Sequence, residues 1–260
     1  MTLNSSTKTL SLSSILVFLL LIFISCKNQS YINTVTDGRY IKIDSTISRN
    51  LEIENYLAPF RQHIESDLSK VLCYNPNDLN KTEAKWQNPM TNLFADVVFE
   101  IGNNIFEKRT GKPIDFCMLN YGGIRANIAK GNISTRTAYE IMPFENNAVV
   151  LNVDGTTVYE IAEFILKNQT AHPISNIEIL ADKENLELKQ LKIGGVEVDK
   201  NKKYFVITND FLAKGGDRMD FFLNASETHI LDYKLRNMFI AYFSKTDTLR
   251  PSYQKRIILE

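Results

Sequence analysis

Three loop-like segments of the sequence carry residues that could bind a ligand. The first, "LNYGGIRAN" (residues 119–127), follows a strand-like run and places Asn120 before a Gly-Gly turn and Arg125 after it. Glycines let backbone amides approach an anion closely, and a guanidinium offers a planar fork to phosphate or carboxylate. The segment therefore predicts an anion site, although a structural turn with a solvated arginine accounts for the same residues about equally well.

The other two segments are "MPFENN" (142–147) and "TNDFLAKGGD" (208–217). Phe144 follows a proline at a chain corner, with Asn146 close behind, and Phe211 and Asp217 flank a second Gly-Gly pair. An aromatic ring can stack on a base, and a carboxylate can accept hydrogen bonds from ribose hydroxyls. Two such phenylalanines on facing loops would enclose a purine, whereas a single phenylalanine is more often a core residue.

The common catalytic signatures are missing from the sequence. None of its three histidines belongs to an H-x-H, D-x-H or H-E-x-x-H arrangement, and neither a G-x-S-x-G elbow nor a Walker loop occurs. We therefore expect no catalytic residue and no metal ligand in this chain. The histidines are predicted to be surface or partly buried residues; they are His63, His172 and His229.

The N-terminus has the pattern of an export signal. The apolar run Ile15 to Ile24 is too short to span a bilayer, which needs ~20 residues, but it suits the hydrophobic region of a signal peptide. Ser25-Cys26 follows directly, which is typical of a bacterial lipoprotein signal cleaved before an acylated cysteine. This predicts a signal peptide over residues 1–25, lipidation at Cys26 and a membrane-anchored protein of the bacterial cell envelope. An ordinary cleaved signal and an uncleaved anchor remain alternatives.

Charge and cysteine content exclude two classes of protein. The chain has 30 basic and 30 acidic residues, so it offers no overall positive charge to a nucleic acid, and we expect no nucleic-acid partner. Beyond the predicted lipidation site only Cys73 and Cys117 remain. They could form one disulfide or stay free, but a disulfide-based scaffold is excluded.

Hydrophobic periodicity predicts helices and strands mixed along the whole chain. A leading strand at 40–44 belongs to a tether over residues 26–49, and the domain itself is predicted over residues 50–260. Helices are expected at 50–71 (interrupted by Pro59), 92–106, 135–142, 155–168 and 231–243. Strands are expected at 113–120, 148–153, 174–180, 191–198 and 202–211. Because no regular βαβ alternation appears, the pattern favours one compact α/β or α+β domain.

The ligand-like segments together resemble a known family. "NYGGIR", "MPFENN" and "TNDFLAKGGD", in this order, and the upstream "MTNLFAD" helix are similar to the C-terminal domain of the 5′-nucleotidase family, over most of residues 51–259. The resemblance implies layers in the order α/β/β/α with mixed sheets. It implies that Phe144 and Phe211 sandwich a base, that Asn120 and Asn146 lie near the base, that Asp217 binds the ribose and that Arg125 lies on the phosphate side.

The sequence departs from the family pattern at three places. Tyr121 stands at the first glycine of the usual N-G-G-G-I-R, and Arg218 stands where a glycine usually follows G-G-D. Arginine resists the positive φ angles that glycine tolerates. Upstream, Lys81 or Lys85 is the nearest substitute for a phosphate-binding arginine of the family. We therefore expect nucleoside binding to be better preserved than phosphate binding.

In the family, an N-terminal metallophosphatase domain holds two metal ions and cleaves the phosphate ester. This sequence lacks the motifs of that domain, so hydrolysis is expected to need a separate metallophosphatase chain carrying the divalent metal ions, with no cofactor in this chain. The resemblance thus implies the nucleoside- or nucleotide-binding component of a 5′-nucleotidase-type phosphohydrolase. A lipoprotein that captures nucleosides without catalysis, or a scaffold for protein contacts, remains an alternative.

Overall fold

The computed structural model describes residue 38 and residues 40–260. The predicted signal peptide and the lipidation site at Cys26 lie outside the described residues. Residues 52–260 form one compact unit. Residues 40–44 are irregular, whereas their alternation predicts a strand. Their apolar side chains remain exposed (Ile41 is 76% exposed), and alternation alone does not make an edge strand without a neighbour to share its hydrogen bonds.

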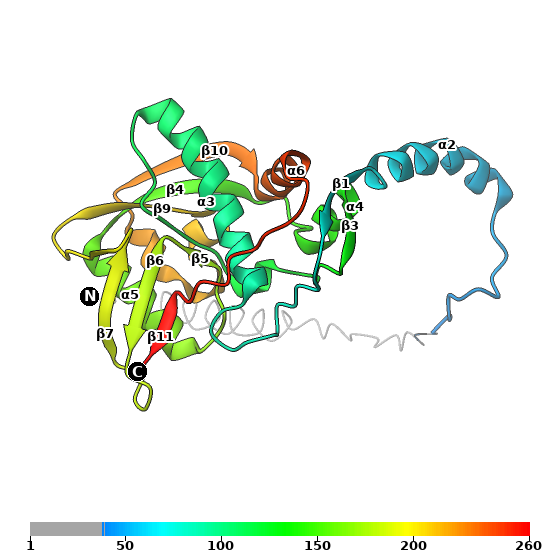
Figure 1. The fold of residues 1–260 in the computed structure, drawn as a ribbon. Coiled ribbons are helices and arrows are strands. Elements are labelled where there is room, and N and C mark those ends of the chain that lie inside the picture. Colours follow the sequence, from blue (N-terminus) through cyan, green and yellow to red (C-terminus); the bar gives the residue numbers. More distant parts are fainter. Residues whose placement is uncertain (1–37, 39) are drawn as a thin grey trace, which may run out of the picture. The chain divides into compact units, whose positions relative to one another are not determined.

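The described part of the chain contains five α-helices, coloured along the sequence in Figure 1. They are α2 (Leu51–Leu68), α3 (Pro89–Thr110), α4 (Thr135–Ile141), α5 (Gly155–Asn168) and α6 (Leu235–Lys245). The first four confirm the predicted helices, including a proline inside α2. Helix α3 begins where Asn88 and Thr91 form a reciprocal capping box, and it ends at Gly111 with φ 73°. No described helix is both long enough and apolar enough to cross a bilayer.

Three sheets, two of which mix parallel and antiparallel pairs, occur among the described residues. The largest has the strand order β10-β4-β9-β2-β5, the second β11-β6-β7-β8, and the smallest pairs β1 with β3. The strands are β1 (Val71–Asn75), β2 (Phe116–Met118), β3 (Gly131–Ser134), β4 (Asn147–Asp154), β5 (Ile174–Ser175), β6 (Ile177–Ala181), β7 (Leu188–Ile193), β8 (Val196–Glu197), β9 (Lys203–Asn209), β10 (Glu227–Lys234) and β11 (Ile257–Leu259). The mixed α/β class is the one that the sequence predicts.

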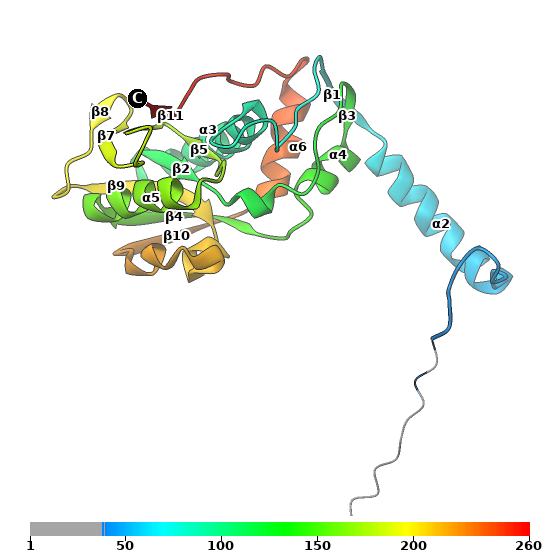
Figure 2. The ribbon, with the colours of Figure 1, turned by 90° about the horizontal axis from the view of Figure 1, so that it is seen from below.

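The inner strands of the five-stranded sheet, β2, β4 and β9, are buried on both faces. Their alternate residues Cys117, Val150 and Ile207 pack into one hydrophobic cluster with α3 and α6, which lie side by side over this face (Figures 1 and 2). The neighbouring residues Phe116, Leu151 and Val206 point the other way, into a second cluster with α5 and the four-stranded sheet. This two-residue alternation with both faces apolar explains why these strands read as nearly continuous hydrophobic runs.

Two regions differ from the sequence-based expectation. Residues 231–234 belong to strand β10, so the predicted closing helix is wrong over its first four positions and begins at Leu235. Helix α2 has apolar residues at helical spacing, yet none of its residues is buried. Both of the cysteines that the structure describes, Cys73 and Cys117, are buried free thiols, so the disulfide that the sequence leaves open is not formed.

Candidate functional site

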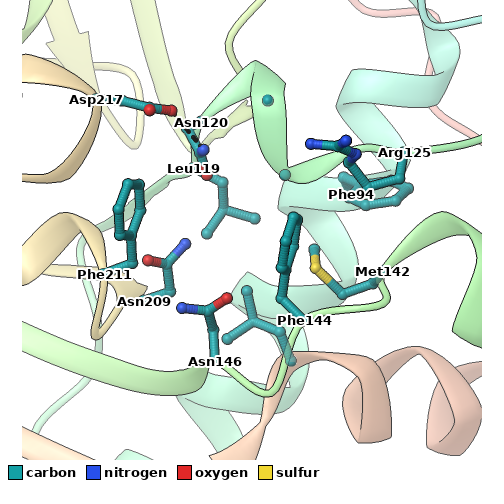
Figure 3. A pocket seen from close by; sticks show the side chains of 13 residues that line it. Phe94, Leu119, Asn120, Arg125, Met142, Phe144, Asn146, Asn209, Phe211 and Asp217 are labelled. Carbon is teal, nitrogen blue, oxygen red and sulfur yellow. Dashed lines mark hydrogen bonds between the residues drawn. The ribbon is translucent and has the colours of Figure 1, made fainter. Parts of the chain in front are cut away.

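All six sequence-predicted binding residues line one cavity of about 350 Å³, which Figure 3 shows from close by. They come from three separate loops: Asn120 and Arg125 follow β2, Phe144 and Asn146 follow α4, and Phe211 and Asp217 follow β9. The other lining residues are Phe94, Leu119, Gly122, Gly123, Met142, Asn209 and Leu235. A cavity of this size with an apolar lining and a few convergent polar groups is typical of small-ligand sites.

The two phenylalanines stand on opposite sides of the cavity with a gap between them (Figure 3). Phe144 is 40% exposed and Phe211 is 46% exposed. Large aromatic side chains are usually buried in a core, so two that keep this exposure across one gap are available to pack against a flat ligand. We refer to the loop 142–146 as the Phe144 side of the cavity and to the loop 209–218 as the Phe211 side.

The Phe211 side is a tight turn closed by main-chain hydrogen bonds. The carbonyl oxygen of Phe211 accepts from the Lys214 amide at 3.3 Å and from the Gly216 amide at 3.0 Å. Gly215, Asp217 and Arg218 all have positive φ, at 81°, 54° and 63°. The position that the family pattern gives to glycine therefore does take a left-handed conformation here, and Arg218 adopts it at some conformational cost.

Asp217 is tied to the first loop across the cavity mouth. Its Oδ2 accepts a 2.6 Å hydrogen bond from Asn120 Nδ2, drawn as a dashed line in Figure 3. Since Asn120 occupies one carboxylate oxygen, the other oxygen of Asp217 is not committed to this bond. The pair therefore presents a fixed carboxylate that can accept a further hydrogen bond from a ligand hydroxyl.

His172 forms a hydrogen bond with the same loop, a contact that the sequence does not reveal. It is only 7% exposed, so the expectation of a surface or partly buried histidine is wrong for this residue. Burial lowers the pKa of His172 to about 4, with smaller opposing effects from a backbone contact at Leu119 and the charge of Asp217. The neutral ring accepts a 3.2 Å hydrogen bond from the Tyr121 amide at Nδ1.

Two side-chain amides form the floor between the phenylalanines (Figure 3). Asn146 donates from Nδ2 to Asp210 Oδ1 at 2.9 Å, so its Oδ1 is the atom left to face the gap. Asn209 accepts the Leu212 amide at Oδ1 at 2.9 Å, so its Nδ2 faces the gap as a donor. The hydrogen bonds to Asp210 and Leu212 thus leave one acceptor and one donor facing the gap. Asn209 is the last residue of β9 and is a site residue that the sequence analysis did not identify.

Positive charge gathers beside the first loop. The Arg125 guanidinium carbon lies 5.4 Å from the centre of the Phe144 ring. Lys81 Nζ donates to the Ile124 carbonyl at 2.6 Å and lies 4.3 Å from the centre of the Tyr121 ring. Burial, followed by the charge of Arg125, lowers the pKa of Lys81. Of the two lysines considered from the sequence, Lys81 therefore contacts the Arg125 loop, whereas Lys85 lines a different cavity.

Among residues 38 and 40–260, no three His, Cys, Asp or Glu side chains come together in a way that could hold a metal ion.

Comparison with known proteins gives one family. A family model described as "5′-nucleotidase, C-terminal domain" matches residues 69–224. Protein UshA of Escherichia coli is 26% identical over 223 residues, which cover 82% of this chain and 39% of UshA. Cell wall protein Lmo0130 of Listeria monocytogenes is 25% identical over 208 residues, which cover 72% of this chain and 26% of that protein. The chain thus spans well under half of these relatives.

A similar fold occurs in a solved 5′-nucleotidase precursor from Thermus thermophilus. The TM-score is 0.67 at 21% sequence identity, and the match covers 80% of this chain and 43% of that one. The alternation of helices and mixed sheets described above is therefore an arrangement that a solved protein shares.

Proposed function

Because the chain belongs to the 5′-nucleotidase C-terminal domain family, we propose that its cavity binds the nucleoside part of a nucleotide, with the base between Phe144 and Phe211. One observation carries the proposal. Two half-exposed phenylalanines from separate loops flank a single cavity, and a carboxylate and a guanidinium line the same cavity. Stacking of a base on an aromatic ring contributes ~1–3 kcal/mol to binding.

The polar groups supply the remaining recognition. The uncommitted oxygen of Asp217 accepts a hydrogen bond from a ribose hydroxyl, and Asn120 holds the carboxylate in place. Arg125 interacts with the phosphate, and Lys81 adds a second positive charge on that side. Because lysine lacks the planar fork of arginine, Lys81 binds a phosphate less specifically than a second arginine would. We therefore expect the nucleoside to contribute more to affinity than the phosphate does.

The proposal also covers where hydrolysis takes place and where the protein is located. The catalytic half is a separate metallophosphatase chain that supplies the divalent metal ions, and it docks where the ligand phosphate emerges. The support is that the matched family is that of a C-terminal domain, and that the described residues form a binding cavity but bring no three possible metal ligands together. We further infer that the chain is exported and lipid-anchored at Cys26 in the bacterial cell envelope; the support is the apolar run before Ser25-Cys26 and the name of the cell wall relative.

Calorimetric titration of the full chain with adenosine and AMP, without added metal, tests the binding proposal. We expect saturable binding of both, with AMP only slightly tighter than adenosine. Phe211→Ala should raise the adenosine dissociation constant by about 5- to 150-fold through loss of the stack. Asp217→Ala should weaken adenosine binding and leave the free base adenine unaffected, since only the riboside reaches the carboxylate.

Phe60→Ala is the matched control. Phe60 is a 54% exposed phenylalanine on α2 and lines none of the cavity, so its removal should leave adenosine binding unchanged. A folded wild-type chain that binds neither adenosine nor AMP would refute the nucleoside site and favour the scaffold alternative. An unchanged dissociation constant in Phe211→Ala would refute the base sandwich.

A further inference from the structure

Arg236 is a buried charged residue whose side chain contacts the Phe144 side of the cavity. It lies in the first turn of α6, beyond the residues that the family model matches, and it is only 5% exposed. Its guanidinium carbon lies 4.1 Å from the centre of the Tyr139 ring. Burying a guanidinium is costly unless its donors are satisfied, so the partners of this side chain indicate what it does.

Those partners are successive residues of the Phe144 side. Arg236 Nη1 donates to the carbonyl oxygens of Pro143 at 3.2 Å and Phe144 at 3.5 Å. Arg236 Nη2 bonds to Glu145 Oε1. One guanidinium thus bridges the two peptide groups on either side of Phe144 Cα and the side chain that follows. A lysine could not reproduce this, because it lacks the planar fork.

The residues around Arg236 reinforce the same contact. Lys234 pairs with Glu145 Oε2, and the Leu235 amide donates to the Asn146 carbonyl at 3.0 Å. The end of β10 and the start of α6 therefore hold the whole corner through three consecutive residues. Phe144 itself is half-exposed, so core packing does not fix its ring. The Arg125 guanidinium carbon lies 5.4 Å from the centre of this ring.

We propose that Arg236 is a positioning residue for ligand binding: its guanidinium holds the Phe144 corner so that the ring faces Phe211 across the cavity. Arg236 acts through Phe144 and does not touch the ligand. The effect on affinity rests on the proposed nucleoside function, whereas the effect on the orientation of Phe144 does not.

Stability alone does not account for the arginine. Arg236 Nε is buried without a hydrogen-bond partner, so part of its desolvation cost is not returned. Replacing a buried ion pair with an apolar side chain of similar volume is often neutral or stabilising. Glu145 is 60% exposed on its side chain and keeps Lys234, so it is not left as a buried charge. We therefore expect Arg236→Met to fold.

Titration of adenosine into the full chain tests the effect on affinity through a double-mutant cycle. Arg236→Met should raise the dissociation constant about tenfold in the wild-type background. In a Phe144→Ala background the same change should have almost no effect, because the residue that Arg236 positions is gone. A general weakening of the fold would lower affinity equally in both backgrounds, and that result would overturn the proposal, as would an unchanged dissociation constant in Arg236→Met alone.

Arg256 provides the matched control. It is also 5% exposed, bonds to the Ile174 carbonyl and pairs with Asp96, but it lies outside the nucleoside cavity. Arg256→Met should lower the free energy of unfolding and leave the adenosine dissociation constant of the folded protein unchanged. A tenfold loss of affinity in this variant as well would show that the loss of any buried arginine weakens adenosine binding. That result would overturn the specific role of Arg236.

A second measurement needs no ligand. In full-length protein labelled with fluorophenylalanine, the Phe144 resonance is identified by its loss in Phe144→Leu. We expect this resonance to be shifted from the free amino-acid position in the wild type and to move towards that position in Arg236→Met. An unmoved resonance overturns the positioning role. If the wild type fails to bind adenosine, the nucleoside function fails, and the resonance still decides whether Arg236 orients Phe144.

Discussion

The Phe211 side of the cavity is a turn closed by its own main-chain hydrogen bonds, whereas the Phe144 side is a corner held by side chains of Lys234 and Arg236, at the junction of β10 and α6. Phe211 bonds to amides three and five positions ahead. Pro143 and Phe144 bond to an arginine 93 and 92 positions away. The two rings line one cavity, but one is placed by local sequence and the other by tertiary structure.

This difference indicates how each side can fail. A change within 211–218 acts directly on the conformation of the turn, because the main-chain hydrogen bonds that close it are local. The Phe144 side depends instead on a charged cluster of Glu145, Lys234 and Arg236, so changes outside the loop reach it. The predictions below test this asymmetry, from the largest expected effect to the smallest.

The largest effect is expected from lowering the pH, which reduces the free energy of unfolding through His172. This residue contacts the loop whose Asn120 bonds to Asp217. The pKa of His172 is about 4 in the folded protein, below its ordinary value of 6.5, so only the unfolded chain takes up the proton between these values. The stabilising contribution of the neutral ring is complete above pH 6.5 and is lost as the pH falls. Urea unfolding should show about 3 kcal/mol less stability from His172 at pH 4 than at pH 7.

His172→Gln isolates this contribution, because glutamine can still accept the Tyr121 amide but does not titrate. The wild-type stability should fall relative to the variant as pH decreases from 7 to 4. Parallel curves for His172→Gln would show that the Asn120 loop does not depend on a neutral buried histidine.

The second effect concerns the local turn itself. A methyl group at Gly216 would lie 2.5 Å from Cε1 of the Phe211 ring and 2.6 Å from the Phe211 carbonyl oxygen. Gly216→Ala should therefore displace the ring or open the turn, at a cost of about 2 kcal/mol in the free energy of unfolding. Because the ring moves, adenosine affinity should fall about tenfold. Urea unfolding and calorimetry measure the two losses separately.

The same substitution in a Phe211→Ala background is the control. With the ring absent, Gly216→Ala should weaken adenosine binding no further. If Gly216→Ala bound adenosine as the wild type does, the Phe211 side would not depend on its local turn, and the contrast between the two sides would fail.

The smallest effect requires both sides to be in place, since each contributes one amide to the floor. Asn146 offers an acceptor and Asn209 a donor. The adenine amino group and an adjacent ring nitrogen complement this pair, whereas hypoxanthine presents a carbonyl and an N–H in their place. We expect adenosine to bind about tenfold more tightly than inosine, a difference of ~1.4 kcal/mol.

Asn209→Asp replaces the donor with an acceptor and keeps an oxygen for the Leu212 amide. It should reduce or reverse the preference for adenosine, measured as the ratio of the two dissociation constants. Asn201→Asp adds the same charge at an exposed position outside the cavity and should leave the ratio unchanged. Equal affinities for adenosine and inosine in the wild type would show that the floor does not read the base.

The three loops could be predicted because their chemistry lies in contiguous motifs. Residues that act across the chain could not. His172 and Arg236 reach the site through partners 51 and at least 91 positions away, and nothing in their immediate sequence marks them. Asn209 lies inside the 208–217 segment, but only the bond of its Oδ1 to the Leu212 amide shows which of its atoms faces the cavity. The bound of β10 was missed for a related reason. Only Leu231 of that strand is buried, so it lacks the alternation of a half-buried strand, and α6 starts after Lys234 without a side-chain cap.

The rates at which the two buried thiols react with an alkylating reagent report how fast different parts of the fold unfold. Burial raises the pKa of Cys73 to about 11 and that of Cys117 well above its ordinary value, and only a thiolate reacts readily with an alkylating reagent. Labelling therefore waits for local or global unfolding. Cys73 lies in the two-stranded sheet and Cys117 in β2, an inner strand of the five-stranded sheet. The two labelling rates would separate fraying at the small sheet from opening of the sheet that carries the cavity.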